Sequence, residues 1–268
     1  MPDNETGSGI SNSIEGPFVQ KILFDEPIPV QGFDIGVYSS PAGKVGGDFI
    51  KFFYPVGTDD KAADMGVIVA DAVDKGPIAF DYSHEALKHV QTAASLPSID
   101  TPEDMLRYVN EKLYQNQKNQ MFITALLGLL DGKSGEFSYA RAGHELLLLF
   151  DSNFQLIDAP FQEGQPLGTL PYPSIDSGTV KIPEGGILVI ISDGIVDETD
   201  TDNKRFDKDR LIKAIQQSGH LSMEDLIISI EYAICTHQAG TPQFDDHSLV
   251  VVRRYPIESQ VSGEIFLL

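Results

Sequence analysis

Apolar and polar positions along the chain predict strands that arrive in groups. The segments at residues 33–39, 48–54 and 65–71 are rich in β-branched and aromatic residues, which is typical of strands. The last two are separated by a short segment containing glycine and aspartates, which indicates a hairpin loop. Further apolar segments predict strands at residues 121–130, 136–142, 146–150, 179–182, 187–192 and 248–254.

Helical spacing of apolar residues occurs in two pairs of segments. The clearest start lies at Thr101, which is suited to cap a helix, with Pro102 at its first position. Asp104 is placed like the acid of a capping box. The predicted helices cover residues 80–94, a segment that begins at residue 102, residues 207–218 and residues 223–237.

Strands in groups and helices in pairs do not match the regular alternation of a parallel doubly wound sheet. The order predicts an α/β layered sandwich (α-β-β-α), with two mainly antiparallel sheets flanked by helix pairs. Residues 1–16 are rich in Gly, Ser, Asn and acids, which predicts a disordered polar tail. Residues 17–268 are predicted to form a single domain, a common arrangement for layered β-rich folds of this length.

The apolar content, 41% of 268 residues, is enough for a substantial core. The one cysteine, Cys235, rules out a disulfide within the chain and fits a reducing compartment. Because it lies in a predicted helix, Cys235 is expected to be a core residue. The apolar runs are too short to cross a bilayer, and the first residues lack the features of a secretory signal. We therefore expect a cytoplasmic protein without membrane contact.

The net charge of the chain argues against some classes of function. The chain has 40 Asp and Glu against 19 Lys and Arg, a formal net charge of -21. Such a surface repels nucleic acid phosphates and anionic lipid headgroups, so the charge argues against nucleic-acid binding. An acidic surface serves solubility or collects divalent cations, and the positions of individual aspartates must separate the two.

Aspartates stand where predicted buried strands meet turns. Hard cations such as Mg2+ and Mn2+ prefer carboxylate, carbonyl and water oxygens. The six histidines are scattered, so the pattern does not favour zinc. Each aspartate alone is a weak signal, since Asp-Gly is a common turn dipeptide. Together they suggest a metal site formed by Asp48, Asp71, Asp193 and the Asp245–Asp246 pair.

Six short motifs follow one another along the chain: VGGDF at 45–49, VIVADAVDKG at 67–76, MFIT at 121–124, YARAGH at 139–144, SDGIVD at 192–197 and DDHSLVVV at 245–252. In this order and spacing they resemble the PPM superfamily of metal-dependent protein phosphatases. Within it, the match is to the SpoIIE/RsbU branch of bacterial serine phosphatases. The resemblance covers about residues 18–254, and the family's two antiparallel sheets between helices agree with the predicted layers.

The resemblance implies hydrolysis of phosphoserine or phosphothreonine on a partner protein, with two Mn2+ or Mg2+ ions. Asp71 would bridge both metals, and the backbone carbonyl of Ala72 would add a ligand to one of them. Asp193 and Asp245 would hold the other metal. Asp48 would act mainly through metal-bound water, which makes Asp48 and Asp71 the expected catalytic residues.

Other residues of the motifs are expected to support the site. Asp246 would orient Asp245 rather than bind metal directly. Gly47 and Gly194 would allow tight backbone turns, and His144 would serve as scaffold rather than as a general acid.

The loop after Asp71 departs from the family pattern. Val73 stands where animal and plant relatives carry a histidine that is proposed as general acid, and it has no proton to donate. Asp74 replaces a glycine, so it either strains the loop or adds negative charge, although aspartate tolerates left-handed geometry better than most residues. Lys44 and Lys75 are candidate phosphate contacts, with ordinary solvated lysines as the alternative.

Partners also follow from the resemblance. Relatives dephosphorylate STAS-domain anti-anti-sigma proteins, so a phosphorylated protein of this type is the expected substrate. A regulatory protein could dock on residues 19–24, placed before the first strand, and on the helix pair at residues 80–117. Two rival interpretations are a catalytically weak PPM-fold binding module and a calcium-stabilised domain, although the chain lacks an EF-hand loop.

Overall fold

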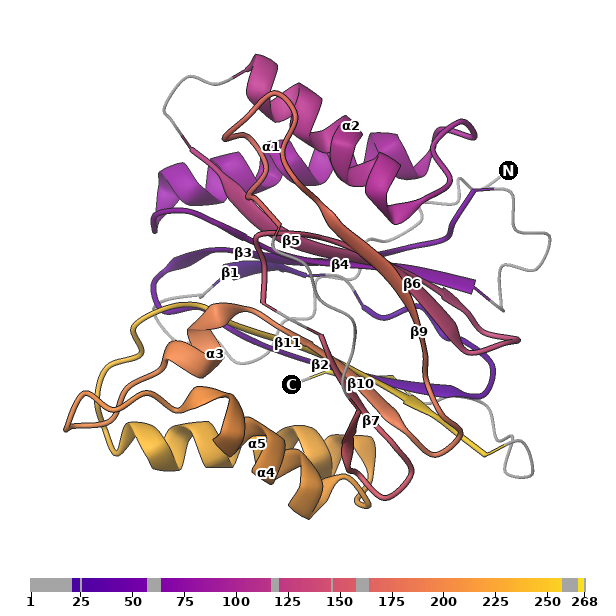
Figure 1. Cartoon of the computed structure of the whole chain (residues 1–268). Helices are drawn as coiled ribbons and strands as arrows, with labels where there is room; N and C mark the ends of the chain where they lie inside the picture. Colours follow the sequence, from indigo (N-terminus) through magenta and orange to yellow (C-terminus); the bar gives the residue numbers. More distant parts are fainter. Residues whose placement is uncertain are drawn as a thin grey trace, which may run out of the picture.

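The computed structural model of the protein describes residues 21–24, 26–56, 64–116, 121–145, 147–157, 164–256 and 265–267. In these residues, two six-stranded sheets pack face to face, and a helix pair covers each outer face (Figure 1). The predicted α-β-β-α sandwich is therefore confirmed. The predicted tail at residues 1–16 lies outside the described residues.

The first sheet has the strand order β1-β3-β4-β5-β6-β9. Neighbouring strands are antiparallel except for β1 and β3, which are parallel. The segment at residues 19–24 was expected to precede the first strand, but its described part forms β1 at the sheet edge. The strands are β1 (Lys21–Phe24), β3 (Val45–Phe53), β4 (Asp64–Ala72), β5 (Ile123–Asp131), β6 (Glu136–Ala142) and β9 (Asp176–Lys181).

The second sheet has the order β12-β2-β11-β10-β7-β8, with β12 parallel to β2 and all other pairs antiparallel. Strand β10 is entirely apolar, and so is the middle of β11, because both of their faces are covered. The strands are β2 (Phe33–Ser40), β7 (Leu148–Phe150), β8 (Leu156–Ile157), β10 (Ile187–Ile191), β11 (His247–Arg254) and β12 (Ile265–Leu267).

Helices α1 (Pro77–Ala94) and α2 (Pro102–Gln115) cover the first sheet, and α4 (Asp207–Ser218) and α5 (Met223–Gln238) cover the second (Figure 1). The predicted cap of α2 is confirmed, since the Thr101 side chain accepts the Asp104 N–H at 3.1 Å. No helix in the described ranges is long and apolar enough to span a membrane.

Three details differ from the prediction. Helix α1 begins at Pro77 rather than residue 80, because Gly76 with φ 81° ends the preceding loop and proline suits a first helical position. The short helix α3 (Asp193–Asp197) has too few residues to show a period. Cys235 lies in α5 as predicted but is exposed rather than in the core, because its neighbour Ile234 occupies the buried face.

The alternation of side chains along β4 decides which way Asp71 points. In β4, Val67 and Val69 face the other sheet, whereas Ile68 and Ala70 face the helices. Because side chains alternate with a period of two, Asp71 continues the face that looks into the space between the sheets. The inner apolar face of β4 therefore ends in a carboxylate.

Candidate metal centre

Asp48 and Asp71 are neighbours on the first sheet. Antiparallel β3 and β4 pair Phe49 with Ala70, so the next pair in the same register is Asp48 and Asp71. Ile50 belongs to the core between the sheets, and Asp48 shares its face. Both carboxylates thus project between the sheets, at one end of the sandwich.

The second sheet brings two more aspartates to this end. Strands β10 and β11 are antiparallel, and their link continues beyond the strand, where the Ser192 N–H donates to the Ser248 carbonyl at 2.9 Å. The Ser248 N–H in turn donates to the Ser192 hydroxyl at 3.0 Å. Asp193 follows β10 and Asp245 precedes β11, so both leave the sheet at the same point.

Asp246 joins the two sheets. Its buried carboxylate accepts the N–H of Ala42 at 2.8 Å through Oδ1, and the N–H groups of Gly47 at 2.6 Å and Asp48 at 3.3 Å through Oδ2. Its own N–H donates to Asp245 Oδ1 at 2.9 Å. One residue therefore positions both the start of β3 and the Asp245 carboxylate.

The two glycines allow close backbone approach. A Cβ on Gly194 would lie 2.1 Å from the Asp246 carbonyl oxygen, and a Cβ on Gly47 would lie 2.9 Å from the Ala72 carbonyl oxygen. The expected tight turns are not found at these glycines, because Gly47 lies within β3 and Gly194 within α3, and neither has a positive φ. What they provide is room for neighbouring chain segments.

Burial and mutual repulsion perturb these carboxylates. Burial, followed by the charges of Asp71 and Asp246, raises the pKa of Asp48 well above its ordinary value. Burial, followed by the charge of Asp193, raises the pKa of Asp71 to about 7. The pKa of Asp193 is raised by burial and then by the charge of Asp245. Groups that repel one another in this way favour a bound cation.

The donor atoms at this end of the sandwich are of the type that a hard divalent cation prefers. All the facing donors are oxygens, and the buried Oδ2 of Asp48 has no hydrogen-bond partner among the described residues. The carboxylates influence one another electrostatically, but among the described residues no three His, Cys, Asp or Glu side chains lie together as a group that could hold a metal ion. The Ala72 carbonyl oxygen lies close to Gly47, 2.9 Å from where a Cβ on that glycine would sit.

The loop after Asp71 adopts two positive φ angles, 78° at Asp74 and 81° at Gly76. Asp74 thus takes the left-handed conformation, and its Oδ1 accepts the Lys75 N–H at 2.8 Å. Val73 packs against the core beneath α1 and α2. The loop therefore accommodates the replacement of glycine by Asp74.

The two candidate phosphate contacts lie in different places. Lys75 forms an ion pair with Asp245, with 3.3 Å between Nζ and Oδ2. Lys44 is exposed in the loop between β2 and β3. The ion pair links Lys75 to one of the four aspartates that we take as candidate ligands, Asp48, Asp71, Asp193 and Asp245.

His144 lies behind the site. It is buried, and its Nδ1 is 2.9 Å from the hydroxyl of Thr124, which pairs with Asp71 across the strands. Burial, followed by the charge of Arg141, lowers the pKa of His144 to about 3. A neutral, enclosed imidazole cannot serve as a general acid, and the geometry suits a scaffold role.

A buried hydrogen-bonded pair that the sequence analysis missed supports the Asp245 segment. Glu198 Oε2 lies 3.0 Å from His247 Nε2, and both side chains are buried. The same oxygen accepts the Phe244 N–H at 3.4 Å. No local sequence signal indicates this pair, because it depends on two residues 49 positions apart.

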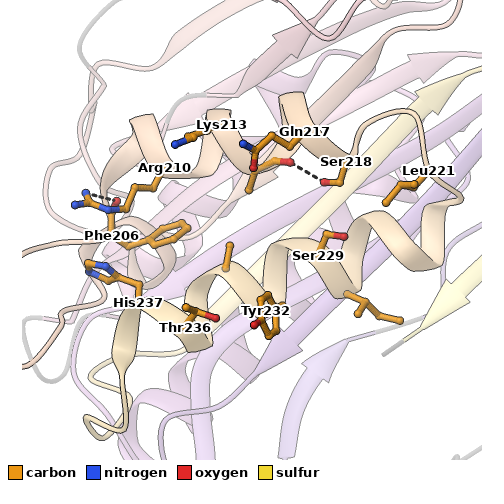
Figure 2. Close-up of a pocket in the computed structure, with 13 residues that line it drawn as sticks. Phe206, Arg210, Lys213, Gln217, Ser218, Leu221, Ser229, Tyr232, Thr236 and His237 are labelled. Atoms are coloured by element: carbon orange, nitrogen blue, oxygen red, sulfur yellow. Dashed lines mark hydrogen bonds between the residues drawn. The ribbon is translucent and has the colours of Figure 1, made fainter.

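A separate groove of about 770 Å3 lies between α4 and α5 (Figure 2). Phe206, Arg210, Lys213, Tyr232 and His237 are among its lining residues (Figure 2). None of the four aspartates lines it, so the groove is distinct from the candidate metal centre.

The layered fold, with carboxylates at one end of the sandwich, is that of a PPM-type protein phosphatase. The chain belongs to the Stage II sporulation protein E (SpoIIE) family, whose sequence model matches residues 61–255. It lies in the branch that contains RsbU: it is 27% identical to "Phosphoserine phosphatase RsbU" of Bacillus subtilis over 263 residues, 94% of this chain and 74% of RsbU.

Solved structures agree on the fold. The SiaA-PP2C domain of Pseudomonas aeruginosa matches with a TM-score of 0.72 and 15% identity, covering 83% of this chain and 86% of that one. The RsbU and RsbW domains of Rv1364c from Mycobacterium tuberculosis match with a TM-score of 0.71 and 20% identity, covering 87% and 63%. At these identities the likeness concerns the fold.

Gly194→Ala is expected to destabilise the protein and disturb Asp245 and Asp246. The new Cβ would need to push the Asp246 carbonyl from 2.1 Å, and overpacking of this kind costs about 1–3 kcal/mol. Chemical denaturation measures the loss. Gly43→Ala is the matched control, since its Cβ meets its nearest atom at an ordinary 3.7 Å. Equal stability of the two variants would contradict the packing argument.

Stability without metal is expected to fall as pH rises. The folded pKa of Asp71 is about 7 against an ordinary value of 3.8, so the folded state binds the extra proton between these values. Its contribution is complete below pH 3.8 and is lost as pH rises through 7. Melting temperatures in excess chelator at several pH values measure this. Asp71→Asn should flatten the decline, and an unchanged decline in that variant would refute the assignment.

Proposed function

We propose that this chain is a metal-dependent phosphoserine/phosphothreonine protein phosphatase that uses two divalent cations, Mn2+ or Mg2+. The observation that carries the proposal is that Asp48, Asp71, Asp193 and Asp245 come to one end of the sandwich, where burial and neighbouring carboxylates raise the pKa of the first three. Membership of the SpoIIE family supports it.

Each residue has a proposed task. Asp71 and the Ala72 carbonyl, at the end of β4, would hold one cation, and Asp71 would also serve the second. Asp193 and Asp245, from the other sheet, would hold the second cation. When bound, the two ions supply an activated water and neutralise charge on the phosphoryl oxygens. Asp48 is the buried acceptor placed to orient that water through its free Oδ2.

Protonation of the leaving oxygen is proposed to come from solvent. Val73 has no ionisable proton, and buried His144 remains neutral because its pKa is about 3. Neither of the positions where relatives place an imidazole provides an acid here. This limits the rate for poor leaving groups but leaves the hydrolytic step itself in place.

The proposed substrate is a phosphorylated protein regulator with a STAS domain, as the resemblance to the SpoIIE/RsbU branch implies. The relative RsbU of Bacillus subtilis is named a phosphoserine phosphatase, which supports a phosphoserine substrate. The acidic chain, with net charge -21, also fits a protein substrate better than a nucleic acid.

Asp193→Asn is expected to lower the hydrolysis of an aryl phosphate by about 100-fold or more, because it removes the charge of a metal ligand. Mn2+-dependent turnover, with and without chelator, measures the effect. Asp197→Asn is the matched control in the same short helix, where Asp197 pairs with Arg205 at 2.7 Å. Full turnover of wild type in excess chelator, or of Asp193→Asn, would refute the two-metal proposal.

A phosphorylated STAS-domain protein from the same source is expected to lose phosphate at least about tenfold faster than an unrelated phosphoprotein, as selective enzymes discriminate by contacts around the reacting group. Phosphate release in the presence of Mn2+ measures both rates. Equal rates would remove the STAS assignment while leaving the phosphatase proposal intact.

A further inference from the structure

Lys75 occupies a fixed loop between β4 and α1. The positive φ angles of its two neighbours, Asp74 and Gly76, restrict the backbone on either side. The Asp74 side chain also accepts the Lys75 N–H at 2.8 Å. The loop therefore directs the lysine across to the segment that precedes β11.

Three contacts hold the Lys75 ammonium on that segment. Nζ lies 3.3 Å from Asp245 Oδ2 and donates to the Phe244 carbonyl. It also lies 3.9 Å from the centroid of the Phe244 ring. Phe244 is 67% exposed, which is unusual for phenylalanine, and a ring that caps a cation explains its position.

The ammonium covers the outer oxygen of Asp245. The inner oxygen, Oδ1, accepts the N–H of Asp246 at 2.9 Å, so the backbone already uses it. Oδ2 is the oxygen that faces Lys75. A divalent cation that binds Asp245 through Oδ2 must therefore meet the lysine charge.

We propose that Lys75 is a tethered counter-cation that competes with a divalent ion for Asp245 and so sets the metal affinity of that half of the centre. The inference rests on the proposed function, and it replaces the simple role of phosphate contact that the sequence suggested. The side chains of Lys75 and Asp245 are 47% and 32% exposed, so water screens the pair and it opens readily. Lys75 thus weakens metal binding without blocking it.

Mn2+ titration of the full chain tests the sign of the effect. The electron paramagnetic resonance signal of free aqueous Mn2+ reports binding without any need for activity. Lys75→Gln is expected to tighten the weaker Mn2+ site by about threefold to tenfold, the range that a surface ion pair with a cation–π contact can supply. Lys75→Arg keeps the charge and should bind like wild type. Phe244→Leu should give an intermediate gain, because it removes the ring from beneath the ammonium.

Lys213→Gln is the matched control. It makes the same change in net charge, but Lys213 lies on α4 in the distant groove (Figure 2). Any tightening in this variant measures the general attraction of a more acidic chain for cations. The Lys75 effect is the difference between the two glutamine variants.

Several results would overturn the inference. If Lys75→Gln binds Mn2+ no more tightly than Lys213→Gln, Lys75 does not compete with metal. If Lys75 contacts phosphate instead, Lys75→Gln would leave the Mn2+ affinity unchanged and would weaken inhibition by inorganic phosphate. If wild type binds two Mn2+ ions and only the Lys75 effect is missing, the proposed function survives alone. If neither wild type nor Lys75→Gln binds Mn2+, both the metal centre and this inference fail.

Discussion

The site depends on one buried carboxylate that bridges two sheets. Asp246 accepts three backbone N–H groups from the segment around the start of β3, although it belongs to the chain some 200 residues further on. Hydrogen bonds to a charged group contribute about 1.5–3 kcal/mol each, and their loss would leave buried donors unsatisfied. The same residue orients Asp245 through its N–H. Asp246 therefore both aligns the two sheets and places the carboxylates.

Negative charge at the same end of the sandwich opposes the stabilisation that the hydrogen bonds of Asp246 provide. The strand faces that form the core between the sheets run outward into Asp48 and Asp71 on one sheet and into Ser192 and Ser248 on the other. The hydroxyls lower the pKa of Asp48, but burial and neighbouring charge outweigh them. The apolar core thus supplies rigidity, while its rim concentrates negative charge that destabilises the folded protein. Functional sites commonly reduce stability in this way.

Much of this could be predicted from the sequence, and the exceptions have physical reasons. The sandwich and the cap at Thr101 follow from local periods and capping chemistry. The exposure of Cys235 did not, because α5 carries apolar residues on several faces, including Ile228 and Tyr232, which are 44% and 72% exposed. Strand-end aspartates indicated a metal site, yet the Glu198–His247 pair and the contact of Lys75 with Asp245 depend on tertiary packing. Sequence can locate ligands at strand ends but not the partners that hold them.

The rival interpretation, a catalytically weak binding module, must account for the buried Asp48. A buried carboxylate with an unpartnered oxygen costs free energy, and nearby carboxylates increase that cost. A protein that only needed the fold would gain stability by replacing it with an apolar residue of similar volume. The changed loop residues Val73 and Asp74 do not lower the free-energy cost of burying Asp48. Asp74 adopts a left-handed conformation, and Val73 packs on the core. The proposed cations would offset the repulsion between Asp48 and Asp71, whereas the binding-module interpretation provides nothing that does so.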